Sequence, residues 1–574
     1  MNLNSQSSFY PPQPDNPSDA ERYFLTNYAL TKLGWPEDFE LIKHRMSPPP
    51  SITGFATPGE WKGKKVGVLG GGLAGLASAY ELRKLGFEIT ILDALEDRVG
   101  GRVYTGYFNR QKNLYGEFGP MRIPVIHETV WHYIKLLGLP TRPFIQYNPN
   151  GFVYLHDTRV RNDPDGQSVM QSIYPKYHLS DWEKNMNWQR LFYAGLESHL
   201  LGASPEERAE ILEVKPRYSE KALLWNRHSS LHMMEAAGLG QEAINLIVNF
   251  NALLKGNLYS SYIDFIQESY PADMSYLYEI PGGMAKLPLA FYLSFQSNNP
   301  YPEIAPEQIG KVCYKAGSWV TEIRLTQNGR KVEVGYEGKN RRKKVREEFD
   351  YVVCALPFST LRNVAVQPLF SNLKMRAIRE VNYTTAQKTL FLCKERFWER
   401  EGIVGGSSYT DLPLASIWYP SDHAAFINNQ NRSVADQVTN LPWNEPGVFI
   451  PSYNFTLDTI RLTSQPPEKR LEDFMRETEA VHGLSPGYLS TVLRGCKTVN
   501  WDQEPTFRGS ICFFTPEQKR IFSYVMTLPE YGDRVFFAGE HISAVHRWMQ
   551  GALQSGMQAA NDLAAACGRM NGHK

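Results

Sequence analysis

The sequence lacks an excess of charge of either sign. Its 61 lysine and arginine residues are balanced by 60 aspartate and glutamate residues, which gives a formal net charge of +1 at pH 7. A chain this balanced has no broad electrostatic field with which to attract nucleic acid or an anionic membrane. We therefore expect a small-molecule partner, and neither nucleic acid nor a membrane.

Cysteine is scarce, and long apolar runs are missing. The six cysteines are scattered singly and form no C-x-x-C pair, so we expect reduced thiols. The most apolar run, VGVLGGGLAGLASAY, is rich in glycine and shorter than the roughly 20 apolar residues that cross a bilayer. The N-terminus has neither the basic nor the apolar region of a secretory signal. These features predict a cytoplasmic protein without a transmembrane segment.

The chain is long enough for two to four structural units, because 574 residues exceed the usual size of one domain several-fold. Residues 1–20 are polar and proline-rich, and we expect them to be loose. Residues 20–35 have helical spacing, and residues 47–65 read as an irregular connector. Residues 177–254 show helical periodicity, and alternating stretches that follow predict a β-rich middle third.

A glycine pattern lies between two predicted strands. Gly70, Gly72 and Gly75 follow the strand KKVGVL and open a helix that ends at Gly86, and a second strand ends at Asp93. Small residues there allow backbone N–H groups at a helix N-terminus to approach a pyrophosphate, and the acid can accept hydrogen bonds from ribose hydroxyls. The order of these elements predicts a dinucleotide site in a Rossmann-like α/β domain.

Two further turns favour FAD over NAD. The turn Gly100-Gly101-Arg102 resembles the second fingerprint of the glutathione-reductase-type FAD fold, and Ala538-Gly539-Glu540 precedes a final helix. Together with GPMRIP (119–124), PGGMAKLP (281–288), FWEREGIVGGSSYTDLP (397–413) and AGEH (538–541), these turns make the chain resemble the flavin amine oxidases, closest to the L-amino-acid oxidases. The resemblance runs from about Trp61 to Asp562.

The resemblance implies an FAD-binding, glutathione-reductase-type α/β domain, a mixed β-sheet substrate domain and a helical insertion. The boundaries we predict are an N-terminal extension and connector (1–60), an FAD-binding domain (61–102 with 275–380 and 526–574), a substrate-binding domain (103–170 with 381–525) and a helical domain (171–274).

The resemblance also implies catalytic roles for Arg122, Lys388 and Tyr453. Arg122, in the GPMR turn, would receive the substrate carboxylate through two parallel N–H donors, and Tyr453 would add a hydroxyl. Lys388 would hold a water at flavin N5, helping reoxidation by O2 or imine hydrolysis. Three alternatives stay open: Arg122 pairs with an internal acid such as Glu117, Lys388 lies on an edge strand and reaches solvent, and Tyr453 is a core residue.

Other positions are assigned by the same resemblance. Ile511 and Trp548 would line the substrate cavity beside Arg122 and Tyr453, although Trp548 and Trp501 can also be read as plain core residues. The residues implied in cofactor binding are Gly70, Gly72, Gly75, Asp93, Ala94, Gly101, Arg102, Gly119, Pro120, Met121, Arg122, Val320, Trp501, Gly539, Glu540, Trp548 and Met549. No histidine pair has metal-ligand spacing, so no metal is expected.

The chain departs from its relatives at two points. Asp93 stands where many relatives have glutamate, so the ribose contact can be rearranged. Monoamine oxidases attach FAD through a cysteine directly after a Gly-Gly pair, whereas here Ile511 follows Gly509-Ser510 and Cys512 comes one position later. Because a shift of one residue turns a strand side chain to the other face, FAD should be bound without a covalent bond.

The function implied is oxidative deamination of L-amino acids with O2, giving a 2-oxo acid, ammonium and hydrogen peroxide. One alternative keeps the flavin but acts as an amino-acid 2-monooxygenase or an oxidase of simple amines. A remote alternative is an interaction protein with a structural flavin. The preferred side chain and the oligomeric state stay open; relatives often form homodimers. Specificity should come from the helical insertion, where Trp225, His228 and Met233 cannot be placed from spacing alone.

Overall fold

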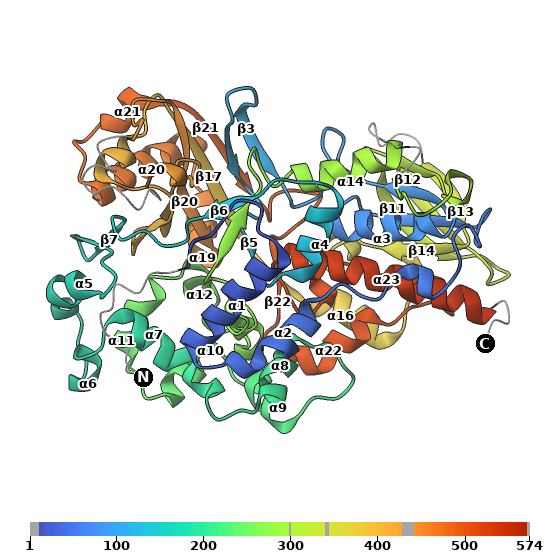
Figure 1. Ribbon diagram of the computed structural model, residues 1–574, viewed down its shortest axis with the longest axis horizontal. Helices are drawn as coiled ribbons and strands as arrows, with labels where there is room; N and C mark the ends of the chain where they lie inside the picture. Colours follow the sequence, from blue (N-terminus) through green and yellow to red (C-terminus); the bar gives the residue numbers. More distant parts are fainter. Residues whose placement is uncertain (1–10, 298–299, 339–343, 428–440, 571–574) are drawn as a thin grey trace.

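A computed structural model describes residues 11–297, 300–338, 344–427 and 441–570. In Figure 1 a sheet covered by long helices lies on one side, a second β-rich region lies at the opposite upper end, and short helices gather below it. The glycine motif belongs to the first region, and Lys388 and Tyr453 lie on β17 (Ala386–Cys393) and β20 (Gly447–Phe455) of the second.

A five-stranded parallel sheet carries the glycine motif. Its order is β10-β2-β1-β14-β23. The strands are β1 (Lys65–Leu69), β2 (Glu88–Leu92), β10 (Val312–Lys315), β14 (Tyr351–Cys354) and β23 (Val535–Phe537). Helix α3 (Leu73–Lys84) follows β1 and packs against the C-terminal α23 (Met549–Met570), and the two run side by side in Figure 1. Apolar strands such as KVGVL suit a sheet that helices cover.

A four-stranded sheet flanks this one, in the order β13-β12-β11-β15. Its strands are β11 (Trp319–Leu325), β12 (Val332–Glu337), β13 (Lys344–Phe349) and β15 (Ala365–Gln367).

A seven-stranded mixed sheet forms the second β-rich region, in the order β21-β17-β20-β19-β18-β7-β8. Its strands are β7 (Phe152–Leu155), β8 (Thr158–Arg161), β17 (Ala386–Cys393), β18 (Ser407–Thr410), β19 (Ser416–Trp418), β20 (Gly447–Phe455) and β21 (Leu493–Asn500). Strand β17 lies between β20 and β21 and is buried along nearly its whole length. The β-rich middle third is confirmed.

The predicted helical insertion is confirmed. Between β8 and β9 (Leu277–Glu279), a stretch that the structure describes completely, the elements are helices alone. The α-helices are α5 (Gln167–Ser172), α6 (Asp181–Lys184), α7 (Trp188–Leu196), α8 (Pro205–Ala209), α9 (Glu220–Arg227), α10 (Ser230–Ala236), α11 (Gln241–Val248), α12 (Ala252–Asn257) and α13 (Tyr262–Ile266). Several begin after a serine or asparagine that caps the helix.

The expectation that residues 1–20 are loose is wrong for residues 11–20, and residues 1–10 lie outside the described part of the chain. The Asn16 N–H donates to the Thr141 carbonyl at 3.1 Å. Ser18 and Glu21 form a capping box at the start of α1 (Asp19–Leu33). These bonds with the rest of the protein offset the entropic cost of ordering a polar, proline-rich segment, and the composition of the segment does not reveal them.

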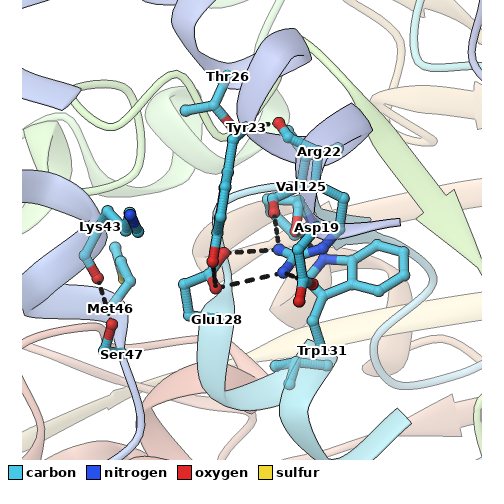
Figure 2. Close-up of polar contacts among 12 residues, drawn as sticks. Asp19, Arg22, Tyr23, Thr26, Lys43, Met46, Ser47, Val125, Glu128 and Trp131 are labelled. Atoms are coloured by element: carbon cyan, nitrogen blue, oxygen red, sulfur yellow. Dashed lines mark hydrogen bonds and ion pairs between the residues drawn. The ribbon is translucent and has the colours of Figure 1, made fainter. Parts of the chain in front are cut away.

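Helix α1 is joined to the body by a buried ion pair (Figure 2). Arg22 is 1% exposed, and its guanidinium donates to Glu128 Oε1 at 2.6 Å and Oε2 at 3.2 Å. It also donates to the Val125 carbonyl at 2.7 Å and to Asp19 at 2.7 Å. The pair joins α1 to the start of α4 (Glu128–Leu136), six residues after Arg122.

The helix α2 (Phe39–Met46) reaches the beginning of α23. The Gln550 amide donates to the Met46 carbonyl at 2.7 Å, and its oxygen accepts from the Thr129 N–H at 3.0 Å. The N-terminal helices therefore brace α4 and α23, the two helices that follow Arg122 and Trp548.

All six cysteines are free, as expected. Across the described ranges, no helix combines the length and apolar character needed to span a bilayer. Within the same residues, no group of three or more His, Cys, Asp or Glu side chains is arranged to hold a metal ion.

Candidate active site

The glycine loop after β1 is shaped for close approach of a ligand. Gly70 has a φ of +103°, which favours glycine, and a Cβ on Gly75 would lie 2.1 Å from the Gly70 carbonyl oxygen. A Cβ on Gly72 would meet nothing within 4 Å, so space lies in front of the N-terminus of α3. The loop thus combines tight internal packing with an open side at a helix N-terminus, as a pyrophosphate requires.

Asp93 follows β2 and faces this loop. Its carboxylate accepts hydrogen bonds from the Tyr314 hydroxyl and, at 3.3 Å, from the Leu95 N–H. The Ser318 N–H donates to the Asp93 carbonyl at 2.7 Å, and Val320, two residues later, packs beside the core that includes Leu92. Burial raises the pKa of Asp93, while Tyr314 opposes the rise. The Tyr314 contact is not predictable from the motif, because the tyrosine comes from β10, far away in the sequence.

The second fingerprint and the C-terminal turn meet through an ion pair. Arg102 Nη1 donates to Glu540 Oε1 at 2.9 Å and to the Ser510 carbonyl at 2.7 Å. Burial acts to raise the pKa of Glu540, but the charge of Arg102 overrides it and holds the pKa at about 2. Glu540 also accepts the Arg547 N–H at 3.0 Å. Two segments more than 400 residues apart therefore form one fixed polar unit.

Arg122 is held by a wall of aromatic rings rather than by an acid. Its Nη1 donates to Gln146 at 2.8 Å, and its guanidinium carbon lies 5.2 Å from the Trp418 ring and 5.9 Å from the Trp548 ring. The alternative of a pair with Glu117 is wrong, because Glu117 accepts instead from Thr105 at 2.9 Å and the Met284 N–H at 2.8 Å. Burial lowers the pKa of Arg122.

Lys388 lies inside the protein. It is 2% exposed and donates to the Gly119 carbonyl at 2.7 Å, so the edge-strand alternative is wrong. Burial lowers the pKa of Lys388 to about 7, with Glu117 opposing this shift and Arg122 adding to it. Burial likewise raises the pKa of Glu117 to about 8. The amine beside the GPMR turn is thus able to change charge near neutral pH.

Tyr453 lies opposite Lys388 on the paired strands β20 and β17. The Lys388 Nζ is 4.3 Å from the centre of the Tyr453 ring. Burial raises the pKa of the Tyr453 hydroxyl, with the charge of Arg122 opposing, so the hydroxyl stays protonated and can donate at neutral pH. Strand pairing therefore brings Lys388 and Tyr453 together, and Arg122, in the GPMR turn, is close enough for its charge to act on both.

The remaining predicted residues surround this group. Trp501 is buried and donates to the Phe118 carbonyl at 3.2 Å, next to Gly119. Trp548 packs edge-on against His127 at 5.0 Å. On β22 (Ile511–Phe513), Ile511 packs with the core beside Trp501, whereas Cys512 belongs to the core behind the five-stranded sheet. The predicted opposite orientation of Ile511 and Cys512 is confirmed.

The sequence reading missed several neighbours of Arg122. Gln146, Trp418 and Glu268 come from segments without a recognisable motif. Arg547 offered a local signal, because it directly precedes Trp548, and it adopts a left-handed φ of +74°. The helical insertion contributes Glu268 and Asp273, whereas the residues considered earlier, Trp225, His228 and Met233, pack within that insertion.

Comparison with known proteins identifies the class. The family described as flavin containing amine oxidoreductase matches residues 73–564. The chain therefore belongs to this family, whose flavin the glycine loop and the two fingerprint turns are shaped to accept.

Individual relatives fit this assignment. YobN of Bacillus subtilis (strain 168) is 29% identical over 505 residues, 87% of this chain and 94% of YobN. An L-amino-acid oxidase of Pseudechis australis is 28% identical over 510 residues, 87% of this chain and 86% of that protein.

Solved structures share the fold. Putrescine oxidase bound to putrescine has a TM-score of 0.65 at 16% identity, covering 88% of this chain and 99% of that one. Cyclohexylamine oxidase from Brevibacterium oxydans IH-35A has a TM-score of 0.63 at 16% identity, covering 87% and 98%. The FAD-binding α/β architecture predicted from sequence is confirmed.

Replacing Gly75 with alanine should reduce flavin binding. The added Cβ would lie 2.1 Å from the Gly70 carbonyl oxygen and push the loop away from the ligand. Overpacking of this kind costs about 1–3 kcal/mol, or about 5- to 150-fold in affinity. Flavin content after purification and the Kd for added FAD measure the effect. Gly54→Ala is the control, because its Cβ would meet nothing within 4 Å; equal FAD affinity in both variants would contradict the role of the loop.

Proposed function

We propose that this protein catalyses FAD-dependent oxidative deamination of L-amino acids, releasing a 2-oxo acid, ammonium and hydrogen peroxide. The observation that carries the proposal is the partly buried guanidinium of Arg122, which is hydrogen-bonded to a neutral amide and lies close enough to Lys388 and Tyr453 for its charge to act on both. A simple amine offers this guanidinium nothing to bind, whereas an α-carboxylate matches it.

The residues that would hold FAD without a covalent bond belong to three turns. The glycine loop would face the pyrophosphate, Asp93 would bind the ribose, and the unit of Arg102 and Glu540 would close the site. Burial raises the pKa of the Cys512 thiol well above its ordinary value and keeps it neutral, which supports a non-covalent flavin. Bound to these residues, FAD would supply the acceptor for the α-hydrogen and the route by which electrons reach O2. We propose residues 61–102, 275–380 and 526–574 as the FAD-binding domain.

The protein's own part is orientation and exclusion of water. Arg122 and the Tyr453 hydroxyl would hold the substrate carboxylate, and Trp548 and Ile511 would wall the α-carbon. Fixing the reacting atoms in this way converts a bimolecular encounter into an intramolecular one. Lys388 would hold a water molecule or a proton at its Nζ, opposite the Gly119 carbonyl.

Product analysis tests the proposal against its rivals. Purified protein is screened for peroxide release with L- and D-amino acids and with simple amines. We expect peroxide together with a 2-oxo acid from L-amino acids. Carbon dioxide plus an amide would instead indicate a monooxygenase, and an aldehyde would indicate an amine oxidase. If no substrate bleaches the flavin anaerobically, the flavin has a structural role only.

Lys388→Met should slow reoxidation of the reduced flavin by at least about tenfold, because a positioned charge or proton donor is lost. The flavin itself should stay bound. Since the pKa of Lys388 is about 7, the wild-type reoxidation rate should change across this pH, and the profile of the variant should be flat. Stopped-flow mixing with O2 measures both. Lys497→Met, an exposed lysine on the neighbouring β21, is the control; a normal oxidative half-reaction in Lys388→Met would refute the role.

A further inference from the structure

The segment from Asp264 to Asp273 is fixed at both ends against the wall of the pocket. Asp264 Oδ1 lies 2.8 Å from His546 Nδ1, two residues before Trp548. Asp273 Oδ2 lies 3.1 Å from His127 Nε2, and the His127 ring packs on Trp548. Because both ends are tied to the surroundings of Trp548, Glu268 in the middle is confined to the same place.

Glu268 is a buried carboxylate without a partner. It is 8% exposed, and among the residues that the structure describes its oxygens make no hydrogen bond and no ion pair. Burial raises its pKa, while the charges of Arg547 and Arg122 oppose the rise. A carboxylate left unsatisfied inside a protein is costly, so its retention calls for a ligand that supplies the missing contact.

Arg122 and Glu268 attract each other without touching. Glu268 is the acid whose charge acts most strongly on Arg122, yet within the described chain the two form no ion pair. Arg122 has N–H donors beyond the one bonded to Gln146. A cation and an anion that are near each other but not in contact are complementary to a ligand that carries an anionic and a cationic group on one carbon. A zwitterionic α-amino acid has this arrangement.

We propose that Glu268 receives the α-ammonium group of the amino acid and accepts one of its protons before the α-hydrogen is removed. This inference rests on the proposed function. One N–H bond breaks, one O–H bond forms, and no electrons change hands, so the products are a neutral amine and a neutral carboxyl group. A carboxyl group whose burial favours the protonated form is a better proton acceptor than a solvated one.

The surroundings link this transfer to substrate binding. The charged and titratable groups around Glu268 are Arg547 before α23, Arg122 before β5 (Ile123–Pro124), Asp273 of its own segment, His127 before α4 and Tyr453 on β20. In the free protein the two arginines stabilise the carboxylate. When a substrate carboxylate neutralises Arg122, that stabilisation falls, and Glu268 gains proton affinity at the moment when the ammonium group arrives.

Two unreactive probes separate the ammonium contact from the carboxylate contact. 2-Aminoisobutyrate has both groups but no α-hydrogen, and isobutyrate lacks the ammonium. Calorimetric titration of the flavin-loaded wild type should show that 2-aminoisobutyrate binds at least about tenfold more tightly than isobutyrate. A charge-assisted hydrogen bond to the ammonium group provides a difference of this size. In Glu268→Gln this preference should fall below about threefold, while isobutyrate binding is retained.

The pH dependence supplies an independent readout. The wild-type rate of anaerobic flavin reduction should rise with pH as Glu268 loses its proton, and in Glu268→Gln the rise should move up to the pKa of the substrate ammonium. Glu197→Gln is the matched control, because Glu197 is another carboxyl in the helical insertion whose pKa burial raises, to about 7. Glu268→Asp, which keeps the charge, should retain part of the preference for 2-aminoisobutyrate.

Two results would overturn the inference. One is an unchanged preference for 2-aminoisobutyrate in Glu268→Gln. The other is a loss of activity in Glu268→Gln that is confined to lysine and arginine as substrates. That result would show that Glu268 binds the substrate side chain and not its α-ammonium group. If no amino acid reduces the flavin of the wild type, the proposed function fails, but the comparison of the two probes still decides whether Glu268 binds an ammonium group.

Discussion

Arg122→Ala should lower kcat/KM roughly 30- to 5000-fold for every amino acid that the wild type oxidises. This corresponds to a loss of about 2–5 kcal/mol in transition-state stabilisation. The guanidinium is partly buried, lies over the rings of Trp418 and Trp548 and is hydrogen-bonded to a neutral amide, so its charge is available to a ligand carboxylate. Removing it leaves that carboxylate without its partner in a desolvated site. Steady-state assay of peroxide release, with flavin content matched between samples, measures the loss.

Two variants sharpen this test. Arg122→Lys should recover little, because an ammonium group cannot present two parallel donors. Arg330→Ala, which removes an arginine from an exposed turn, should leave kcat/KM unchanged. Oxidation of simple amines, where detectable, should be insensitive to Arg122→Ala. An unchanged kcat/KM toward all amino acids in that variant would exclude Arg122 as the carboxylate receptor.

Arg22→Ala should lower the free energy of unfolding by about 3–5 kcal/mol, the usual effect of removing one partner of a buried ion pair. The substitution removes two bonds to Glu128, the bond to the Val125 carbonyl and the contact with Trp131 at 5.0 Å (Figure 2). Glu128 would then stay buried as an unpaired charge. Thermal and denaturant unfolding, followed by circular dichroism and flavin fluorescence, measure the change.

An exposed pair provides the comparison. Arg379 bonds Glu380 at 2.8 Å on the surface, and Arg379→Ala should cost about 1 kcal/mol or less. The double variant Arg22→Met with Glu128→Leu should recover much of the stability lost in Arg22→Ala, because no charge is left unpaired. Equal destabilisation by Arg22→Ala and Arg379→Ala would show that the buried pair is not what holds α1 in place.

Local motifs allowed the nucleotide half of the site to be predicted from sequence. Gly70 and Gly75 are constrained by the turn in which they lie, Gly72 faces open space, and Asp93 follows its strand directly, so a short stretch of sequence contains all the residues that this half of the site requires. Lys388 was equally visible as a charged residue in an apolar stretch. Its burial on a central strand removes the one ordinary explanation, a lysine that reaches solvent.

The missed residues depend on contacts between distant segments. Glu268 has no distinctive neighbours in sequence, and its position follows from Asp264 and Asp273, which bind His546 and His127. The helix at residues 20–35 is predicted correctly, whereas the loose head predicted for residues 1–20 is wrong from residue 11 onward for the same reason. The composition correctly indicates that residues near the N-terminus bury little surface by themselves. It does not reveal that Arg22 forms a buried ion pair with Glu128, more than 100 residues away.

The brace formed by α1 and α2 sets the practical limits of the foldable unit. Homology with the family begins at residue 73, yet Met46 and Arg22 hold the first turns of the two helices that flank the pocket. An expression fragment trimmed to the homologous region would expose the indole of Trp131 and leave the carboxylate of Glu128 without its arginine partner. Fusion tags and truncations are better placed ahead of Gln13, because Gln13 and Asn16 already bond the body of the protein before the capping box begins at Ser18.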